Sequence, residues 1–533
     1  MTQEPSDVSR GDNLGSVPSG SPELPLGQQS TVTASDEQLR RWGMPTDPNE
    51  PGAYIVELNL LHRGPVTKAQ ESFLELWKEA VEDASRPPPV KISQTYYSCM
   101  ISRVEQRKLV RLDKAKGPKE SAIFRIWPDF QISSRIDRSI ATVKADAARR
   151  AYAASGRGIT WAVLDSGIHA DHLHFKPYEN VGHDDVKDLH RDFTVPDGPD
   201  GPVLGKALVD EFGHGTHVAG IIAGGLAAPE PGADPAAGAP YVLEKLLEST
   251  GEGQTVASYE RREVTDRTLL SGVAPACKLV SLKVLAADGN GRASNVMRAL
   301  QYIREQVNAD PKILRIHGVN ISAGYEFNAE VFACGQSPLC VEVDRLVRAG
   351  VVVVVASGNT GYGQIMAQGR PGARAGLTDT INDPGNAELA ITVGATHRHM
   401  PHTYGVSYFS SKGPTADGRL KPDLVAPGER ITSCAAGSFL SQVGTLVQAQ
   451  AAEGGDGAPD IPSNLTYIDY SGTSMAAPHV SGTIAAFLSI RQEFIQRPDD
   501  VKRIFLDSAT SLGRERYFEG HGLVDLMRAI QSV

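Results

Sequence analysis

The sequence predicts an α/β protein whose main domain is a mostly parallel central sheet with helices on both faces. Two observations carry this prediction. Short apolar runs such as 159–164 and 351–356 alternate with helical segments over most of the chain, and strands that are buried on both faces have this continuous apolar character. A separate stretch, 53–130, has the alternating and helical patterns of a small α+β domain that precedes the main one.

The composition is that of an ordinary globular protein, with 533 residues, 41% of them hydrophobic and 22% charged. The formal net charge of -10 and a pI near 5.8 argue against nucleic acid or an anionic membrane as a partner. No apolar run approaches the roughly 20 residues that cross a bilayer, and the chain does not begin with a signal peptide. The five cysteines do not suggest a disulfide framework, so we expect free thiols and a cytoplasmic location.

The N-terminal part of the chain divides into three segments. Residues 1–52 are rich in Ser, Pro, Gly, Gln and acidic residues and lack apolar periodicity, so we expect a disordered leader. In the α+β domain at 53–130, strands are predicted at 54–60, 95–104 and 122–127, and a helix at 68–84. A polar linker is expected at 131–142.

The main domain, 143–533, contains the remaining strands and helices. Strands are predicted at 159–164, 279–285, 318–322, 351–356 and 390–393, and helices at 143–154, 294–307, 341–349, 474–490, 501–507 and 524–530. In sheets of this kind ligands bind at the carboxyl ends of the strands. We therefore expect the functional side chains just after those strands.

Ser474 lies where a polar, Gly-containing turn gives way to a helix of small and apolar residues. The first turn of a helix offers unpaired backbone N–H groups, which can stabilise the negative charge that forms when a serine attacks a carbonyl. Ser474 is therefore a candidate nucleophile. The alternative is an ordinary helix N-cap, a position that Ser also favours.

Asp165 and His214 are the candidate partners of this serine. Asp165 ends an apolar strand, where a screened carboxylate can accept the Nδ1 proton of a histidine; an Asp that only starts a turn is the alternative. His214 lies between Gly213 and Gly215, whose missing side chains are expected to let the imidazole approach a substrate. His217 is expected to be packed and hydrogen-bonded, because the spacing of the two histidines differs from that of a zinc-protease helix.

Asn359 follows the buried strand at 351–356 in a turn that contains glycines. Its side-chain NH2 group can donate a hydrogen bond to the oxyanion of a tetrahedral intermediate. The alternative is an Asn that only tolerates left-handed backbone.

These motifs together resemble those of the subtilisin-like serine proteases, the subtilase family. The matching blocks are Val-Leu-Asp-Ser-Gly-Ile at 163–168, His-Gly-Thr-His-Val-Ala-Gly at 214–220, Ala-Ser-Gly-Asn at 356–359 and Gly-Thr-Ser-Met-Ala-Ala-Pro-His-Val-Ser-Gly at 472–482. The order Asp, His, Ser along the chain is also that of the family. The resemblance covers about residues 143–533 and implies a subtilisin-like fold.

The resemblance also implies roles for individual residues. It makes Asp165, His214 and Ser474 a catalytic triad, with Asn359 and the Ser474 N–H as the oxyanion hole. The stretch 319–324 resembles the edge strand that pairs with extended substrate, which implies substrate binding by Ser322, Ala323 and Gly324. The α+β domain resembles the family's propeptide in its element order, and would act on the main domain of the same chain as a folding aid and temporary inhibitor.

Two insertions depart from the family pattern. One, near 225–271, replaces the usual short calcium-binding loop. Structural calcium remains compatible with the family, but no matching site supports it, and no metal or other cofactor is predicted. The second insertion, near 438–464, contains a candidate helix at 439–452 and leads into the Ser474 turn. We expect it either to lie beside the cleft and limit access of substrate, or to be a surface elaboration.

Other polar clusters are expected to be solvated or hydrogen-bonded and not to bind metal. They are Asp192, the acidic residues of 197–210, and the histidines His169, His172 and His174.

The sequence thus predicts a serine endopeptidase that hydrolyses polypeptide substrates through an acyl-enzyme, regulated or self-processed by its N-terminal domain. One alternative is a peptide-binding or permanently inhibited protein with the same cleft. Another is a serine hydrolase of esters, which the peptide-binding stretch disfavours.

Overall fold

The computed structural model describes residues 45–83, 85–117, 119–128, 137–199, 201–228, 239–249, 255–262, 264, 266–310, 312–367, 370–454 and 461–533. The chain divides into two compact units, Met1–Ser133 and Ser134–Val533. Most of the predicted leader lies outside the described residues, as does the first half of the predicted linker. No helix in the described part of the chain is both long and apolar enough to cross a membrane.

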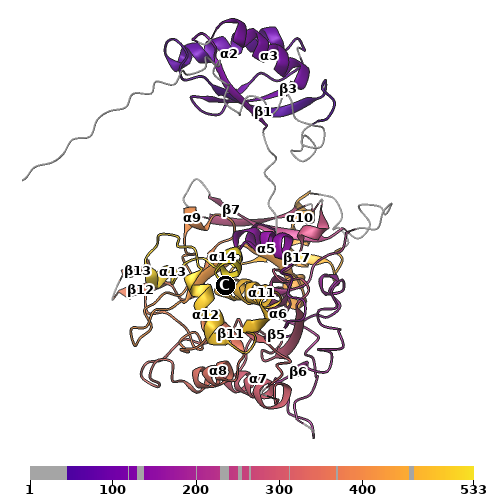
Figure 1. The fold of residues 1–533 in the computed structure, drawn as a ribbon, viewed down its shortest axis with the longest axis vertical. Helices are drawn as coiled ribbons and strands as arrows, with labels where there is room; N and C mark the ends of the chain where they lie inside the picture. The colour runs from indigo at the N-terminus through magenta and orange to yellow at the C-terminus, as the bar shows by residue number, and fades with distance from the viewer. Residues whose placement is uncertain are drawn as a thin grey trace, which may run out of the picture. The chain divides into compact units, whose positions relative to one another are not determined.

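The first unit is a four-stranded antiparallel sheet in the order β2-β3-β1-β4 with two helices on one face (Figure 1). Its elements are β1 (Pro51–Leu58), α2 (Val66–Ala80), β2 (Val90–Lys91), β3 (Tyr96–Ser102), α3 (Arg103–Ala115) and β4 (Ile123–Pro128). Phe73 and Leu76 of α2 and Leu109 of α3 pack into its hydrophobic core. This is the predicted α+β domain, although its first strand begins at Pro51, inside the stretch predicted as leader.

Helix α3 was missed by the sequence prediction, which ended a strand at residue 104. Ser102 accepts the Glu105 N–H at 3.2 Å, and the Glu105 carboxylate accepts the Ser102 N–H at 2.8 Å. This reciprocal capping box starts the helix at Arg103. The helix has few apolar residues, and its buried Asp113 instead accepts the Ala122 N–H at 2.7 Å, so apolar periodicity alone did not reveal it.

The second unit is built on a seven-stranded parallel sheet in the order β15-β14-β11-β10-β5-β9-β6. Its strands are β5 (Thr160–Asp165), β6 (Arg191–Asp192), β9 (Lys278–Lys283), β10 (Gly318–Ile321), β11 (Val352–Ala356), β14 (Ile391–His397) and β15 (Leu424–Glu429). The helices are α4 (Asp137–Thr142), α5 (Ala145–Tyr152), α6 (His214–Ile222), α7 (Ala293–Tyr302), α8 (Pro338–Arg348), α9 (Pro401–Tyr404), α10 (Gly437–Gly454), α11 (Thr473–Leu488), α12 (Pro498–Asp507), α13 (Arg516–Glu519) and α14 (Leu526–Gln531). Short helical turns are η1 (Leu173–Phe175), η2 (Arg267–Leu269), η3 (Ile303–Val307) and η4 (Gln492–Phe494). Helix α4 occupies the second half of the predicted linker.

Both faces of the parallel sheet are covered, as the apolar strands predicted. In β11, Val352 and Val354 join the cluster that includes α6, α11 and α14, while Val353 and Val355 join the cluster that includes α7 and α8. Figure 1 shows α7 and α8 together on one side of the sheet, opposite α6 and α11. The predicted fold class is therefore confirmed.

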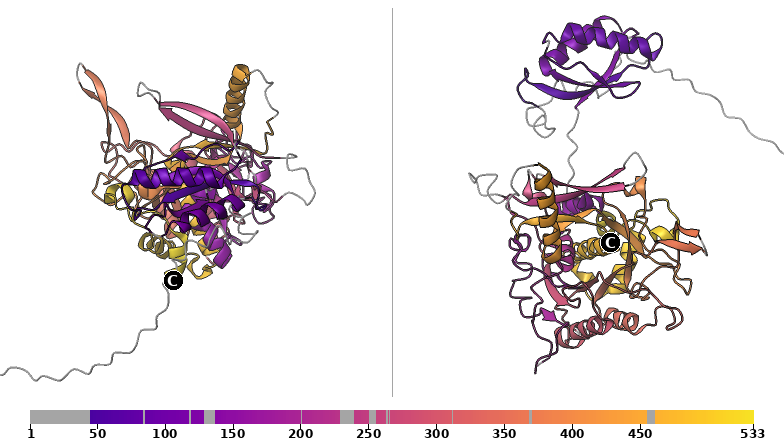
Figure 2. Two further views of the ribbon diagram at one scale, coloured as in Figure 1. Left: turned by 90° about the horizontal axis from the view of Figure 1, so that it is seen from above. Right: turned by 180° about the vertical axis from the view of Figure 1, so that it is seen from behind.

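The two predicted insertions meet on a second sheet. Strands β16 (Ile431–Cys434), β17 (Thr466–Tyr470), β7 (Tyr241–Ser249) and β8 (Thr255–Arg262) pair in the order β16-β17-β7-β8. The hairpin β7–β8 comes from the first insertion and was not predicted, whereas α10 in the second insertion was. Figure 2 shows the hairpin (pink) and α10 (ochre) standing out from the second unit side by side. We call β7, β8 and α10 the accessory layer. A separate hairpin, β12 (Tyr362–Ala367) and β13 (Arg370–Gly376), follows β11.

Candidate active site

Asp165 is the last residue of β5 and is fully buried. The strand lies in the middle of the sheet and pairs with β9 and β10, so the carboxylate projects from the carboxyl edge of the sheet into the protein. Its Oδ1 accepts the N–H of Ser166 at 2.8 Å. The sheet and this bond together hold the carboxylate in one place.

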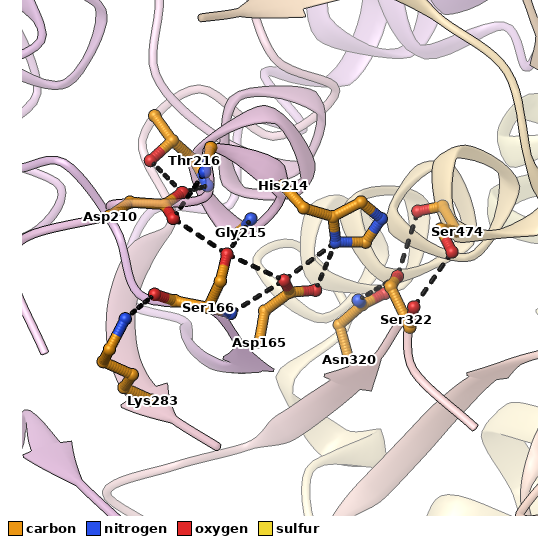
Figure 3. A network of polar contacts seen from close by, with 11 residues as sticks. Asp165, Ser166, Asp210, His214, Gly215, Thr216, Lys283, Asn320, Ser322 and Ser474 are labelled. Carbon is orange, nitrogen blue, oxygen red and sulfur yellow. Dashed lines mark hydrogen bonds and ion pairs between the residues drawn. The ribbon is translucent and has the colours of Figure 1, made fainter. Parts of the chain in front are cut away.

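His214 is the first residue of α6, and its Nδ1 lies 2.8 Å from Oδ1 and 3.0 Å from Oδ2 of Asp165. In Figure 3 the imidazole lies between Asp165 and Ser474. Burial disfavours the charged ring, but the carboxylates of Asp165 and Asp210 outweigh it and raise the pKa of His214 above its usual value. The contact fixes the tautomer with the proton on Nδ1, which leaves Nε2 as an acceptor.

Packing requires glycine on both sides of His214, while the idea that the missing side chains also let the imidazole approach a substrate stays a prediction. Gly213 has a φ of 101°, and a Cβ there would lie 2.2 Å from the Ala436 carbonyl oxygen. A Cβ on Gly215 would lie 2.2 Å from the Gly167 carbonyl oxygen. Both positions therefore need glycine because another backbone segment approaches so closely.

Asp210 supports this pair and was missed as a site residue by the sequence reasoning, which placed it among solvated acidic residues. It is 2% exposed and accepts hydrogen bonds from the N–H groups of Gly213 (2.7 Å) and Thr216 (2.8 Å). It also accepts the Ser166 hydroxyl at 2.8 Å (Figure 3). Asp210 thus anchors the first turn of α6 to the residue that follows Asp165.

Ser474 lies in the first turn of α11, directly after the turn that ends β17. Its hydroxyl donates to the Ser322 carbonyl oxygen at 2.9 Å, and the Ser322 hydroxyl donates to the Ser474 carbonyl oxygen at 3.0 Å (Figure 3). The hydrogen bonds of the site do not include one from Ser474 to His214. Pro478 explains why the Ser474 carbonyl accepts the Ser322 hydroxyl. It lies in α11 four residues after Ser474 and has no N–H to form the usual helical hydrogen bond with that carbonyl.

Asn359 follows β11 and faces the same turn. Its Oδ1 accepts the N–H of Thr473 at 2.9 Å and the Thr473 hydroxyl at 3.1 Å. These bonds orient the amide and leave its Nδ2 group as a donor at the cleft. The left-handed residue here is Gly358, with a φ of 108°, so the alternative interpretation of Asn359 as a left-handed turn residue is wrong.

A cleft of about 460 Å³ brings the remaining predicted residues together. Its lining includes His214, Ser322, Ala323, Gly324, Asn359 and Ser474. Asp165 lies behind His214 and does not line it. Phe212 and the loop Gly289–Arg292 line the cleft as well, and neither was singled out from the sequence.

The stretch 319–324 was predicted to be an edge strand, and the structure corrects this. Its first residues belong to β10, which pairs in parallel with β5 on one side and β11 on the other. Ala323 and Gly324 extend beyond the end of the strand at the cleft, and pairing resumes with a bridge between Tyr325 and Asp383.

The other polar clusters named in the sequence are bonded within the protein. Burial lowers the pKa of His217 to about 3, and its Nε2 lies 3.1 Å from the Ile468 carbonyl oxygen. Burial likewise lowers the pKa of His172 to about 4 and of His174 to about 3. Asp192 accepts the backbone N–H groups of Thr194 and Lys206, each at 2.9 Å. The described residues contain no cluster of three or more potential metal ligands.

A parallel α/β sheet with a histidine and a serine at one cleft, and an aspartate bonded behind the histidine, is the arrangement of a serine hydrolase. Residues 156–523 match the subtilase family, so the chain belongs to that family, as the motifs predicted. The predicted class, a subtilisin-like serine endopeptidase, agrees with this membership.

Several relatives share this region. Pyrolysin of Pyrococcus furiosus is 29% identical over 60% of the present chain, and serine protease AprX of Bacillus subtilis is 26% identical over 72% of it. Subtilisin DY of Bacillus licheniformis is 27% identical over 63% of the chain. The matched regions span 21% of pyrolysin, 69% of AprX and 99% of subtilisin DY.

Proposed function

We propose that this chain is a serine endopeptidase that cleaves polypeptides through a triad of Asp165, His214 and Ser474. The observation that supports it most is the 2.8 Å contact between His214 and the buried Asp165, next to a serine in the first turn of a helix. Such a contact stabilises the imidazolium that forms when histidine removes the serine proton. A histidine with only a packing role would need no buried carboxylate.

The reaction proceeds in two halves. As Ser474 Oγ attacks the scissile carbonyl carbon, its proton passes to Nε2 of His214; that proton then goes to the leaving amine as the C–N bond breaks. Water, activated by the same histidine, hydrolyses the resulting ester. Before the attack, the Ser474 hydroxyl must exchange its hydrogen bond with the Ser322 carbonyl for one with Nε2 of His214.

Asn359 and the backbone N–H of Ser474 stabilise the oxyanion. The Thr473 N–H and hydroxyl hold the Asn359 amide by its oxygen, so Nδ2 is already oriented for donation. A donor oriented in advance needs no reorganisation during the reaction, which is the main source of such stabilisation. The substrate backbone would lie along Ala323 and Gly324, with Gly289–Arg292 across the cleft.

The first unit serves as an intramolecular inhibitor or folding aid. Its sheet leaves one face without helices, and Tyr96, Met100 and Phe124 are exposed. Exposed apolar side chains of a sheet favour burial against a partner. The second unit of the same chain is the proposed partner.

No cofactor enters the proposed reaction, because proton transfer and nucleophilic attack are supplied by side chains. The five cysteines are free, which fits the proposed cytoplasmic location.

The test is to incubate the purified chain and its Ser474→Ala variant alone and to follow intact mass. In parallel, both react with a peptide library and with a fluorophosphonate, which labels activated serines. We expect peptide cleavage, labelling and loss of an N-terminal fragment only in the unmodified chain. Labelling without cleavage of peptides would favour an ester hydrolase, and neither labelling nor cleavage would favour a peptide-binding or permanently inhibited protein. Cleavage with an intact N-terminus would reject self-processing but not the peptidase.

A further inference from the structure

The start of α10 is bonded to the loop that carries His214. The Ser438 N–H donates to the Glu211 carbonyl oxygen at 3.0 Å. A Cβ on Gly437 would lie 2.3 Å from that same oxygen, and one on Gly213 would lie 3.0 Å from the Cβ of Phe439. The second insertion therefore contacts the residues that immediately precede His214, with no room for a side chain or water between the backbones.

Phe439, in the first turn of α10, fills the space behind the imidazole. It is 5% exposed, and its ring centroid lies 6.4 Å from that of His214, with the two planes at 89°. It stacks on Tyr470 at 4.6 Å and lies 5.8 Å from Phe212. Edge-to-face and offset-stacked rings at such distances attract one another and favour one relative orientation.

The accessory layer holds Phe439 in this position. Phe439, Val443 and Val447 lie on one face of α10 and pack in one cluster with Tyr241 and Leu243 of β7. Strand β7 is in turn tied to the core, because Glu244 pairs with the buried Arg398, which also lies 3.3 Å from Asp469 of β17. The ring is therefore supported from both insertions.

The cleft lining takes no residue from α10 among the described residues. The insertion thus lies close to His214 but behind it, and the expectation that it limits access of substrate stays a prediction. A role in holding the catalytic group fits this position better than contact with substrate.

We propose that Phe439 is a positioning residue, which holds the His214 imidazole in the orientation that Asp165 and Ser474 require. Docking of α10 then becomes part of the assembly of the active site. The proposal rests on the proposed role of His214 as general base.

Removal of the ring should change the protonation of His214 as well as its orientation. The titratable groups around the imidazole are Asp165, Asp210, His217 and Tyr470, and none of them belongs to α10. Since burial lowers the pKa of His214, admitting water where the ring was should raise it further.

The test compares Phe439→Leu with Val447→Ala in the full chain. Leucine keeps a buried apolar side chain but removes the flat ring. Val447 lies on the same face of α10 and in the same cluster, roughly 12 Å further along the helix at 1.5 Å per residue. Peptide kinetics, thermal unfolding and the low-field NMR resonance of the His214 Nδ1 proton are measured for each.

We expect Phe439→Leu to lower kcat by about 10- to 100-fold, the size of effect that a small misplacement of a catalytic group produces. KM should stay within about twofold because Phe439 is absent from the cleft lining. The Nδ1 proton should titrate at a higher pH. Val447→Ala should lower the melting temperature while kcat and the titration stay those of the unmodified chain.

The proposal is rejected if Phe439→Leu keeps the kcat and the proton titration of the unmodified chain, or if Val447→Ala changes both equally. If Phe439→Leu does not fold, Phe439→Met, a flexible side chain of similar volume, replaces it with the same expectations. If the unmodified chain cleaves no peptide beyond its Ser474→Ala variant, the proposed function fails. The proton titration, which needs no turnover, still decides the role of Phe439 in that case.

Discussion

The two halves of the candidate site differ in how far they are assembled. His214 is already hydrogen-bonded to Asp165. Asp210 accepts hydrogen bonds from the Ser166 hydroxyl and the Gly213 N–H, which fixes the residues adjacent to this pair. Ser474 is bonded instead to the Ser322 carbonyl. The proposed base is thus preorganised by groups that are buried before any substrate arrives, whereas the proposed nucleophile has not yet formed its hydrogen bond with that base. The difference suggests that substitutions in the first half should affect the chemistry more than those that only touch the second.

Among substitutions that leave Ser474 itself in place, the largest effect is expected from Asp165→Asn, which removes the carboxylate from the preassembled half. An amide at this position donates toward Nδ1 and so favours the wrong tautomer, and it no longer stabilises the imidazolium. We expect kcat/KM for peptides to fall by about 10⁴-fold, as when the aspartate of such a triad is replaced. Steady-state kinetics against the unmodified chain measure it.

Asp192→Asn is the matched control for that variant. Asp192 is also buried, lies on β6 of the same sheet and accepts backbone hydrogen bonds, but it does not touch His214. It should cost stability without the kinetic loss. Equal kinetic losses in the two variants would show that general disruption of the sheet, and not the contact with His214, is responsible.

Asn359→Ala tests the donor side of the cleft and should have the next largest effect. We expect kcat to fall by about 10²–10³-fold with little change in KM, a range that comes from a subtilisin lacking the equivalent donor. Asn180→Ala is the control, because Asn180 is a buried amide that donates at 2.8 Å to the Pro275 carbonyl oxygen, away from the cleft. A rise in KM with kcat unchanged would instead assign Asn359 to ground-state binding.

The pH dependence of kcat/KM tests the pKa of His214, the proposed base. Asp165 and Asp210 together outweigh burial and raise the pKa of His214, and only the neutral ring can accept the Ser474 proton. The acid limb of kcat/KM should therefore have its midpoint above pH 6.5, with about a tenfold loss per pH unit below it. Profiles of kcat/KM from pH 5 to 9 measure this midpoint. A midpoint below 6.5 would mean that burial prevails over the two carboxylates.

The sequence predicted the parallel sheet well because its strands are buried on both faces. The runs at 159–164 and 351–356 need only local composition to be recognised, and β5 and β11 lie within one residue of them. Asp165, His214, Asn359 and Ser474 were singled out as candidates for a related reason, since each lies in a short motif next to such a strand or a helix start.

The features that were missed depend on partners far away in the chain. The hairpin β7–β8 has no regular alternation of apolar and polar residues, and its partner strand β17 comes more than 200 residues later in the chain. Asp210 looks like one acidic loop residue among several until the fold brings Ser166 to it. The glycines beside His214 could not be explained from the sequence either, because Ala436 and Gly167 come to them from other segments.

The smallest effect is expected from Ser322→Ala, which alters the second half of the site. The Ser474 carbonyl loses its hydroxyl donor, and Pro478 cannot replace it. Leaving this partly buried acceptor unpaired should cost at most the roughly 1–3 kcal/mol of a fully buried one, so the melting temperature should fall. The Ser322 carbonyl that binds the Ser474 hydroxyl is unchanged, so kcat should change less than tenfold.

The Ser322 hydroxyl makes two hydrogen bonds, one to the Ser474 carbonyl and one from the Asn320 amide at 2.8 Å. The Pro478→Ala variant distinguishes how much each of them contributes to stability. Alanine at 478 restores a helical N–H directed at the Ser474 carbonyl, so Ser322→Ala should cost less stability in the Pro478→Ala background. Since the two residues share one acceptor, a coupling of about 1 kcal/mol is expected from the double-mutant cycle. Additive losses of stability would mean that the Asn320 contact, and not the Ser474 carbonyl, makes Ser322 important for the fold. In that case the two hydrogen bonds between Ser322 and Ser474 would result from the conformation of the turn before α11 and would not stabilise that turn.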